Sequence, residues 1–422
     1  MRVLVLGGGG REHALCWALR RSASVDAVLC APGNAGIAEV ATLHPVDPTD
    51  VGAVVALARD ERCDLVVVGP EAPLVAGVAD ALSAAGVPVF GPSAAAARIE
   101  GSKAFAKDVM AAAGVPTGGY WTGTDLAEAR RALDRFAAPY VVKADGLAAG
   151  KGVRVCADRA EAEAAIDAAL VDRAFGDAGA RLVIEEFLDG AELSVFVLCG
   201  QGQAHLLGEA QDFKRALDGD RGLNTGGMGA YSPVPVWTGD LQRVVVERIF
   251  QPTLDELARR GTPYVGVLYG GLMLTADGPK VFEFNARFGD PEAQVLLPRF
   301  DGDLGRLLAC CAGAGVEPGV WRWSPQACVT VVLASGGYPG AYATGKPIAG
   351  LEDAAALPDV RVFHAGTRRD GDAVVTAGGR VLAVSGLGGT IAEARVAAYR
   401  GADAIRFEGL HRREDIAAQP TR

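Results

Sequence analysis

Polar side chains alternate with hydrophobic ones from Phe282 to Arg287. On a β-strand, alternate side chains share one face of the sheet, so Glu283, Asn285 and Arg287 would lie together. The hydrophobic residues Phe282, Phe284 and Ala286 would occupy the opposite face. Carboxylate and amide oxygens are ligands that Mg²⁺ prefers, and an arginine can bind a carboxylate or phosphate through two hydrogen bonds. A half-buried strand whose polar face meets water would show the same alternation, but the two acidic residues in the next loop favour a binding site.

A second candidate site begins at Lys143, which ends a short apolar run. A lysine that leaves a buried run is costly unless it meets an anion. The glycine-rich loop Gly146–Gly152 follows at once and contains Lys151, and the backbone N–H groups of such a loop can surround phosphates. The loop does not match GxxxxGK[ST], because a glycine follows Lys151. Many hairpins carry similar glycines, so the loop alone is a weak indication.

The glycine-rich segment Gly7–Gly10 follows the first apolar run, as it would in a dinucleotide-binding fold. The spacing GxGxxG fails, because Glu12 stands where the third glycine is required. The second apolar run also ends without the acidic residue that would bind an adenosine ribose. NAD is therefore the weaker interpretation. A phosphate at the N-terminus of the helix that starts here is reasonable, since free N–H groups and the helix dipole favour an anion.

Short apolar runs alternate with helical stretches through the first hundred residues. The apolar runs lie at 2–6, 27–30, 65–68 and 87–90, and the helical stretches at about 11–20, 49–59 and 74–84. This alternation predicts an α/β fold with a doubly wound parallel sheet, which binds ligands at the carboxyl ends of its strands. Three loops with glycine or proline, at 7–10, 32–36 and 69–73, fall at these ends.

The remaining chain mixes helices and strands. We expect helices at about 102–113, 159–170 and 241–260, and strands within 140–155 and at 181–187, 192–198, 264–275 and 280–287. Ser102 is a suitable N-cap for the first of these helices. Short β-runs and glycine-rich turns without a dense polar cluster follow from about 327. We expect domain boundaries near residues 100 and 326.

Composition excludes several classes of protein. The chain has 422 residues, a formal net charge of −10 and 50% hydrophobic residues. This hydrophobic content argues against disorder, and the acidic balance argues against a general nucleic-acid binder. The eight cysteines form no CxxC pair, and the longest apolar stretch, at about 81–97, is too short and too interrupted to span a membrane. With no signal-peptide pattern, we expect a cytoplasmic protein with small-molecule partners, without nucleic acid or membrane.

Five motifs occur in order along the chain. They are Gly8–Ala14, Gly69–Leu74, Lys143–Gly152, Asn224–Pro233 and Glu283–Glu292. Together they resemble the phosphoribosylamine–glycine ligases, also called glycinamide ribonucleotide synthetases, of purine biosynthesis. The last motif is shared with other ATP-grasp ligases, whereas NTGGMGAYSP, from Asn224, is much more specific. Phe213 and Leu223 depart from the family pattern, which often has His and Pro there, and this bears on substrate contacts rather than on the chemistry.

The resemblance implies three domains: a Rossmann-like substrate-binding domain (1–100), an ATP-grasp domain (101–326) with a mobile lid at about 117–190, and a small mixed-β C-terminal domain (327–422). It also implies site residues. ATP would be bound by Lys103, Lys143, Gly150, Lys151, Glu185, Phe187, Leu188 and Glu192. Glycine and phosphoribosylamine would be bound by Gly8, Gly9, Gly10, Asn34, Glu71, Asp212, Lys214, Thr225, Gly226, Gly227, Met228 and Arg287. Arg287, Asp212 and Lys143 would act in catalysis, and Glu283 and Asn285 would hold Mg²⁺ or Mn²⁺.

The resemblance finally implies a reaction. The carboxylate of glycine would attack the γ-phosphate of ATP to give glycyl phosphate and ADP, and the amine of 5-phosphoribosylamine would then displace phosphate. Three alternatives stay open: an ATP-grasp ligase with another acceptor, an NAD-dependent oxidoreductase, and a nucleotide-binding module without turnover. We expect a monomer.

Overall fold

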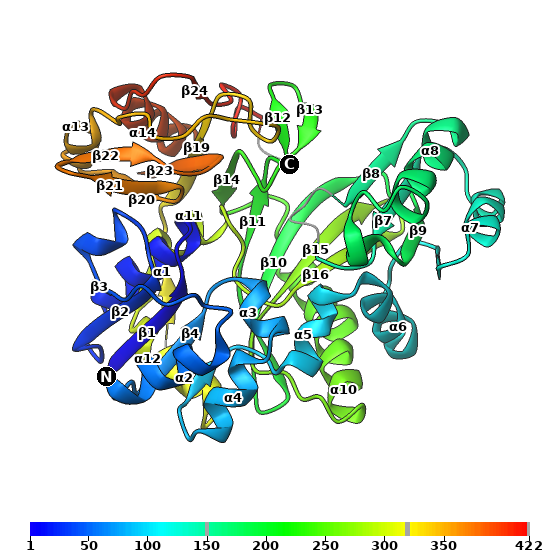
Figure 1. Cartoon of the computed structure of the whole chain (residues 1–422), viewed down its shortest axis with the longest axis horizontal. Helices are drawn as coiled ribbons and strands as arrows, with labels where there is room; N and C mark the ends of the chain where they lie inside the picture. Colours follow the sequence, from blue (N-terminus) through cyan, green and yellow to red (C-terminus); the bar gives the residue numbers. More distant parts are fainter. Residues whose placement is uncertain (148–151, 317–320, 420–422) are drawn as a thin grey trace.

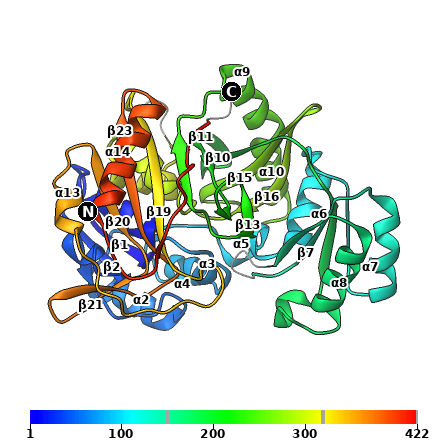
Figure 2. The ribbon, with the colours of Figure 1, turned by 90° about the horizontal axis from the view of Figure 1, so that it is seen from above.

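The computed structural model describes residues 1–147, 152–316 and 321–419. The N-terminal and C-terminal regions pack together on one side of the molecule, and a small unit, residues 120–186, projects from the other side (Figures 1 and 2). We call residues 120–186 the lid unit. A long antiparallel sheet runs between the two sides and connects them.

The N-terminal region is built on a five-stranded parallel sheet in the order β3-β2-β1-β4-β5. Its strands are β1 (Arg2–Gly7), β2 (Ala27–Pro32), β3 (Thr42–Leu43), β4 (Leu65–Val68) and β5 (Val89–Phe90). Its helices are α1 (Gly10–Arg20), α2 (Val51–Asp60), α3 (Glu71–Val75), α4 (Val78–Ala84) and α5 (Ala94–Gly101). Strands β1 and β4 are buried runs of valine and leucine, as a parallel sheet covered on both faces requires. The predicted doubly wound sheet is confirmed.

Two elements differ from the sequence prediction. The helix expected at 74–84 is divided at Gly77, whose φ of +89° lies in the left-handed region. The helix expected near 241–260 starts as α9 (Gly239–Val245), passes through the π-helical turn Val246–Phe250 and continues as α10 (Gln251–Arg259). Pro252 has no backbone N–H, so the regular hydrogen-bond ladder cannot run through this point.

The lid unit has a four-stranded antiparallel sheet in the order β6-β9-β7-β8. Its elements are β6 (Tyr120–Gly123), α7 (Leu126–Ala132), β7 (Tyr140–Ala144), β8 (Val153–Cys156), α8 (Arg159–Leu170) and β9 (Leu182–Glu186), and α6 (Lys103–Ala113) precedes it. Its hydrophobic core, which includes Ile166 and Ile184, is separate from the two larger cores of the molecule. A separate core is what a unit needs in order to move as one body.

The central sheet has the strand order β16-β15-β10-β11-β14-β19-β23-β20. These strands are β10 (Ala191–Gly200), β11 (Gln203–Asp212), β14 (Gly229–Ser232), β15 (Gly266–Thr275), β16 (Gly278–Asn285), β19 (Ala327–Ser335), β20 (Val360–His364) and β23 (Arg380–Gly388), and β24 (Leu410–His411) pairs with β19. The C-terminal strands thus continue the sheet of the middle region through the β14–β19 pair. Residues from both regions therefore reach the same side of one sheet.

Shorter elements complete the fold. They are the two-stranded sheets β12 (Arg215–Leu217) with β13 (Arg221–Asn224), β17 (Phe300–Gly302) with β18 (Trp321–Trp323) and β21 (Thr367–Asp370) with β22 (Ala373–Thr376), and the helices α11 (Ala293–Leu296), α12 (Leu304–Ala312), α13 (Leu351–Ala355) and α14 (Ile391–Ala404). In the described part of the chain, no helix combines the length and apolar composition needed to cross a membrane. All cysteines are free thiols, and only Cys310 among them is partly exposed.

Candidate active site

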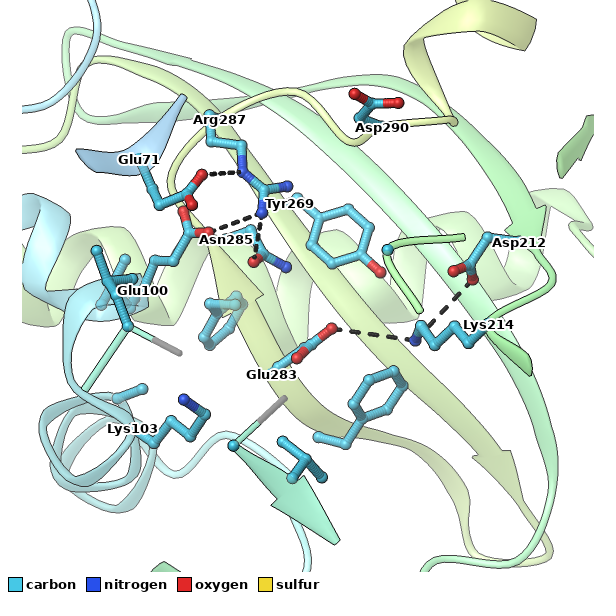
Figure 3. Close-up of a pocket in the computed structure, with 18 of the residues that line it drawn as sticks. Glu71, Glu100, Lys103, Asp212, Lys214, Tyr269, Glu283, Asn285, Arg287 and Asp290 are labelled. Atoms are coloured by element: carbon cyan, nitrogen blue, oxygen red, sulfur yellow. Dashed lines mark hydrogen bonds and ion pairs between the residues drawn. The ribbon is translucent and has the colours of Figure 1, made fainter. Parts of the chain in front are cut away.

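A cavity of about 430 Å³ lies where the N-terminal region, the lid unit, the central sheet and the C-terminal region meet (Figure 3). Expected site residues that line it are Glu71, Lys103, Glu185, Asp212, Lys214, Thr225, Gly226, Glu283, Asn285 and Arg287. The two acids of the loop after β16, Asp290 and Glu292, also line it. Sequence reasoning assigned no role to six further polar lining residues: Arg11, Glu100, Lys107, Tyr269, Tyr338 and Arg380.

Other expected site residues do not line this cavity. They are Gly8, Gly9, Gly10, Asn34, Lys143, Phe187, Leu188, Glu192, Gly227 and Met228. Lys143 and Glu192 nevertheless form ion pairs with lining residues. Met228 is fully buried in the core, and its backbone N–H and C=O both form hydrogen bonds within the protein. Gly150 and Lys151 lie outside the described residues.

A bulge in β16 decides which side chains face the cavity. Glu283 pairs with Gly271 and Val281 with Leu272, so Phe282 has no partner in the ladder. An extra residue in one strand disturbs the alternation of side chains. Phe282 consequently lines the cavity beside Glu283. The prediction that Phe282 lies on the opposite face is wrong, because the bulge depends on the neighbouring strand.

Arg287, just beyond β16, is bound by two carboxylates of the N-terminal region (Figure 3). Its Nη2 lies 2.8 Å from Glu100 Oε1, and its Nε lies 3.3 Å from Glu71 Oε2. Nη2 also donates to Asn285 Oδ1 at 3.2 Å, and Nη1 donates to the carbonyl oxygen of Phe288 at 3.3 Å. Burial raises the pKa of Glu100 to about 7 although Arg287 opposes this shift. The Nε and Nη2 groups of Arg287 are therefore already occupied by carboxylates.

Lys214 holds a second group of carboxylates together. Its Nζ lies 2.8 Å from Glu192 Oε2, 3.9 Å from Asp212 Oδ1 and 4.0 Å from Glu283 Oε1. The same ammonium group lies 4.4 Å from the centroid of the Phe282 ring. Burial raises the pKa of Asp212 to about 8, against the effect of Lys214. Burial opposes the charge of Lys214, but Asp212 and Glu192 raise the pKa of the lysine, which keeps it protonated.

Glu185 of β9 lies between two lysines. Its Oε2 is 2.8 Å from Lys107 Nζ and its Oε1 is 2.9 Å from Lys143 Nζ. Lys107 also donates to Thr117 Oγ1 at 2.8 Å, and Lys143 donates to the carbonyl oxygen of Phe282 at 2.9 Å. Burial disfavours the charge of Glu185, but Lys143 and Lys107 hold its pKa below the ordinary value. This buried network connects α6, the lid unit and β16.

Carboxylates of the protein occupy the N-terminus of α1. The Gly9 N–H donates to Glu12 Oε2 at 2.6 Å. Asp290 accepts a hydrogen bond from the backbone N–H of Arg11, and Gln294 Nε2 donates to Asp290 Oδ1 at 2.7 Å. Because a helix N-terminus attracts negative charge, these carboxylates take the position in which the sequence predicts a phosphate.

Asn34 is also fully engaged within the protein. Its Nδ2 donates to the carbonyl oxygens of Gly8 at 2.9 Å and His364 at 2.7 Å. Its Oδ1 accepts from the N–H groups of Gly36 and Ile37, both at 2.9 Å. Both amide hydrogens are used, so Asn34 shapes the loop after β2 and joins it to β20.

Two side chains of the C-terminal region reach the cavity. Arg380, at the start of β23, donates through Nη1 to the carbonyl oxygens of Gly226 and Asp290, the latter at 2.7 Å. Tyr338 Oη accepts from the N–H of Gly226 at 3.1 Å. A Cβ atom at Gly226 would lie 2.9 Å from Cζ of Arg380, so any larger residue here would displace the guanidinium. Arg380 and Tyr338 form no motif with their sequence neighbours, which explains why sequence reasoning missed them.

Comparison with known proteins bears on this arrangement. Residues 1–100, 101–293 and 328–419 match the N domain, the ATP-grasp (A) domain and the C domain of phosphoribosylglycinamide synthetase, respectively. The chain is 57% identical over 424 residues to the phosphoribosylamine–glycine ligase of Streptomyces coelicolor, with 99% of each chain covered. The chain belongs to the phosphoribosylglycinamide synthetase family. The predicted resemblance is confirmed.

Further relatives agree with this assignment. The phosphoribosylamine–glycine ligase of Rhizobium meliloti is 49% identical over 416 residues, covering 99% of this chain and 98% of that protein. The crystal structure of phosphoribosylamine–glycine ligase from Thermotoga maritima has a TM-score of 0.85 at 34% identity, covering 99% of this chain and 100% of that chain. The biotin carboxylase domain of Hydrogenobacter thermophilus 2-oxoglutarate carboxylase has a TM-score of 0.74 at 17% identity, with 97% of this chain and 91% of that chain covered, which is a likeness of fold alone.

Two side chains of β16 supply some, but not all, of the oxygen ligands that a divalent cation needs. Glu283 and Asn285 both line the cavity, and Asn285 Oδ1 accepts a hydrogen bond from Arg287 at 3.2 Å. Within residues 1–147, 152–316 and 321–419, no group of three or more His, Cys, Asp or Glu side chains is arranged to hold a metal ion. Mg²⁺ commonly uses one or two protein carboxylates and takes its other ligands from water and substrate phosphates. The donor set therefore fits a cation that arrives with nucleotide phosphates.

A histidine pair joins the N-terminal and C-terminal regions. His13 Nδ1, on α1, accepts from the backbone N–H of His364, on β20, at 2.7 Å. His364 Nδ1 lies 3.0 Å from Thr367 Oγ1. Burial lowers the pKa of His13 to about 3, and His364 contributes to this shift. Burial lowers the pKa of His364 to about 4. The folded protein therefore holds both rings neutral.

We expect His13 and His364 to lower the free energy of unfolding as the pH falls from 7 to 5. The buried acids Glu100 and Asp212, with pKa values raised to about 7 and about 8, act in the opposite direction. In the unfolded chain these histidines bind protons near pH 6.5, whereas in the folded protein they stay neutral until about pH 4. Protonation in this window favours the unfolded state, by about 2 kcal/mol per histidine at pH 5. Urea unfolding of the wild type and of His13→Gln at pH 7, 6 and 5 isolates the contribution of one histidine: relative to the wild type, the variant should gain about 2 kcal/mol between pH 7 and pH 5. An unchanged pH dependence in that variant would contradict this origin.

Proposed function

We propose that this chain is an ATP-dependent ligase that joins glycine to 5-phosphoribosylamine, giving glycinamide ribonucleotide, ADP and phosphate in purine biosynthesis. The observation that carries the proposal is the cavity in which Glu283 and Asn285 lie beside Arg287, within a fold of this family. Relatives that are 57% and 49% identical are named for this ligation. We expect the chain to act as a cytoplasmic monomer.

The proposed reaction consists of two substitutions. The carboxylate of glycine attacks the γ-phosphorus of ATP, the bond to ADP breaks, and glycyl phosphate forms. The amine of phosphoribosylamine then attacks the acyl carbon, phosphate leaves, and the amine nitrogen loses a proton. The protein contributes position and electrostatic balance, since Lys103, Lys214 and Arg287 place positive charges among the carboxylates that line the cavity.

We assign glycine to the space between Arg287 and Asp212. In Figure 3 these two residues lie on opposite sides of Tyr269. Because Glu71 and Glu100 hold its Nε and Nη2, Arg287 offers the glycine carboxylate its charge and the second hydrogen of Nη1. Asp212 would accept hydrogen bonds from the glycine ammonium group. We retain Glu71, Thr225 and Gly226 as contacts of the phosphoribosylamine, and Gly8–Gly10, Asn34, Gly227 and Met228 as the backbone that shapes its site.

We assign ATP to the side of the cavity formed by α6 and the lid unit. Lys103 and Lys143 would bind its phosphates, Glu185 to Leu188 its adenine and Glu192 its ribose, with the loop around Gly150 and Lys151 above it. Support comes from Lys103, which lines the cavity and donates to the carbonyl oxygen of Gly146 at 3.2 Å. The Lys143 side chain is only 8% exposed and bound to Glu185, so a phosphate contact requires this pair to rearrange.

The assay that tests the proposed function measures ADP release with ATP, Mg²⁺ and glycine, while phosphoribosylamine is generated in the same tube. We expect ADP only when both glycine and phosphoribosylamine are present. If ADP is released with another amino acid or amine instead, the chain would be an ATP-grasp ligase with a different acceptor. No ADP with any combination would favour a nucleotide-binding module.

Replacing Glu283 with glutamine should raise the Mg²⁺ concentration for half-maximal activity about tenfold or more, because Glu283 and Asn285 would hold the Mg²⁺ or Mn²⁺ that neutralises the ATP phosphates. A Mg²⁺ titration measures this effect, and Mn²⁺ binding by electron paramagnetic resonance measures it without turnover. The control is Asp277→Asn, which removes an exposed carboxylate from the turn before β16. An unchanged Mg²⁺ titration would contradict the metal-binding role of Glu283 and would indicate that its side chain only faces water from a half-buried strand.

A further inference from the structure

We propose that Arg380 and Tyr338 of the C-terminal region bind the phosphate monoester of the aminoribose substrate. This inference rests on the proposed function and adds a location for the phosphate. It assigns to the C-terminal region a direct contact with substrate, at the end of the cavity away from the lid unit.

Hydrogen bonding distinguishes Arg380 from the other two arginines that line the cavity among the described residues. Arg287 gives its Nε and Nη2 to carboxylates, as described above. Arg11 gives its Nε to Glu12 at 2.5 Å and its Nη1 to the carbonyl oxygen of Phe288 at 3.0 Å. Arg380 donates hydrogen bonds to described residues through Nη1, and its Nη2 lies 3.4 Å from Asp290 Oδ2. No described residue accepts a hydrogen bond from Nε of Arg380, so Nε and the second hydrogen of Nη2 can still donate to a ligand.

The Nε–Nη2 edge of Arg380 has the geometry that binds phosphate. Nε–H and Nη2–H of a guanidinium point in parallel and can donate to two oxygens of one phosphate, which a lysine cannot do. Tyr338 Oη uses a lone pair to accept the N–H of Gly226, so its hydroxyl hydrogen can donate. Both side chains line the cavity, and the Arg380 side chain is 21% exposed. Two side chains thus present three donors to one anion.

Neighbouring groups direct the phosphate to this edge. The N-terminus of α1 is filled by Glu12 and Asp290, so it offers no competing position for an anion. Burial disfavours the charge of Asp290, but Arg380 and Arg11 hold its pKa below the ordinary value. Because Asp290 Oδ2 lies 3.4 Å from Arg380 Nη2, the phosphate would share the guanidinium with this carboxylate. The carboxylate can also accept hydrogen bonds from sugar hydroxyls, which suits a ribose between Asp290 and Glu71.

The two phosphate-bearing substrates are then separated along the cavity. Lys103, which we assign to ATP, and Asp290, which binds Arg380, lie at opposite ends of the view in Figure 3. Between them lie Glu283 and Arg287, where the acyl transfer is proposed. The amine of an aminoribose whose phosphate is held at Arg380 can then point toward this centre.

The test compares ligands that differ only in the phosphate. Binding of ribose 5-phosphate, ribose, inorganic phosphate and ADP is measured by calorimetry for the wild type, Arg380→Met, Tyr338→Phe and the control Arg368→Met, an exposed arginine of the same region. We expect Arg380→Met to weaken ribose 5-phosphate at least about tenfold and to leave ADP within about twofold. Tyr338→Phe should weaken ribose 5-phosphate about threefold to tenfold, and Arg368→Met should change neither ligand.

Several outcomes would overturn the proposal. One is an equal loss of affinity for ADP and for ribose 5-phosphate in Arg380→Met. This result would indicate that Arg380 only supports the turn at Gly226 or that it binds the nucleotide. Another is unchanged inorganic phosphate and ribose 5-phosphate affinity in both variants. Thermal unfolding checks that Arg380→Met is folded, and Tyr338→Phe, which removes one oxygen, decides the question if it is not.

Turnover separates this inference from the proposed function. If the wild type makes no ADP with glycine and phosphoribosylamine, the proposed function fails whatever Arg380 does. If the wild type turns over and Arg380→Met keeps its KM for phosphoribosylamine within about twofold, the inference about Arg380 fails alone. We expect KM for phosphoribosylamine to rise at least about tenfold, with KM for ATP unchanged.

Discussion

Replacing Arg287 with alanine is expected to abolish ligation and to destabilise the protein. Its guanidinium balances the carboxylates of Glu71 and Glu100, and removing one partner of a buried ion pair costs about 3–5 kcal/mol. Loss of a cation that holds the reacting carboxylate should lower kcat about a thousandfold or more. ADP release with all three substrates, urea unfolding and ATP binding measure the three quantities. ATP affinity should change little, since Arg287 lies at the glycine side of the cavity.

A double variant separates the two effects of Arg287. Arg287→Met with Glu100→Gln removes both charges of the closest pair, and glutamine can still accept the N–H of Ala286 that Glu100 accepts at 2.6 Å. We expect this variant to regain most of the free energy of unfolding without regaining ligation. If Arg287→Ala instead ligates within about tenfold of the wild type, Arg287 has no part in the reaction.

The centre of the site could be predicted from the sequence because the relevant pattern is local. Glu283, Asn285 and Arg287 alternate along one strand, and their chemistry follows from residue type alone. The position of Phe282 could not be predicted in the same way. Its bulge is created by the pairing of β16 with β15, which contains Gly271 and Leu272, and the sequence of β16 does not reveal that register.

The charged partners of the site are the main part that sequence reasoning missed. Glu100 ends α5 and Lys107 lies within α6, and either would be read as an exposed helix residue. Each is buried against a partner from a distant element: Glu100 meets Arg287, and Lys107 meets Glu185 of the lid unit. Such ion pairs join residues that are distant in sequence, so no spacing indicates them.

The N-terminal loops illustrate a related limit. The sequence correctly predicts glycine- and proline-bearing loops at the carboxyl edge of the parallel sheet. It does not reveal that Asp290, from the loop after β16, reaches the N-terminus of α1 and fills the position that a phosphate would take. A helix N-terminus predicts negative charge, and only the tertiary structure decides whether the protein or a ligand supplies it.

Replacing Glu185 with glutamine should lower the free energy of unfolding by about 3–5 kcal/mol, because it leaves Lys107 and Lys143 in a buried site without their anion. Urea unfolding at pH 7 measures this loss. In the folded protein the pKa of Glu185 is held below its ordinary 4.5, so its contribution is complete above that pH and is lost as the pH falls further. The difference between variant and wild type should therefore shrink below about pH 4.5.

The double variant Glu185→Leu with Lys107→Met tests whether charge or packing is responsible. It removes the closest ion pair and keeps hydrophobic volume, so it should be more stable than Glu185→Gln. Lys143 would then bind the carbonyl oxygen of Phe282 alone, and because that carbonyl adjoins Glu283, ATP affinity should fall even where stability returns. If stability and ATP affinity both recover, the network serves only to attach the lid unit. Binding of ATP phosphates by Lys143 would then not depend on Glu185.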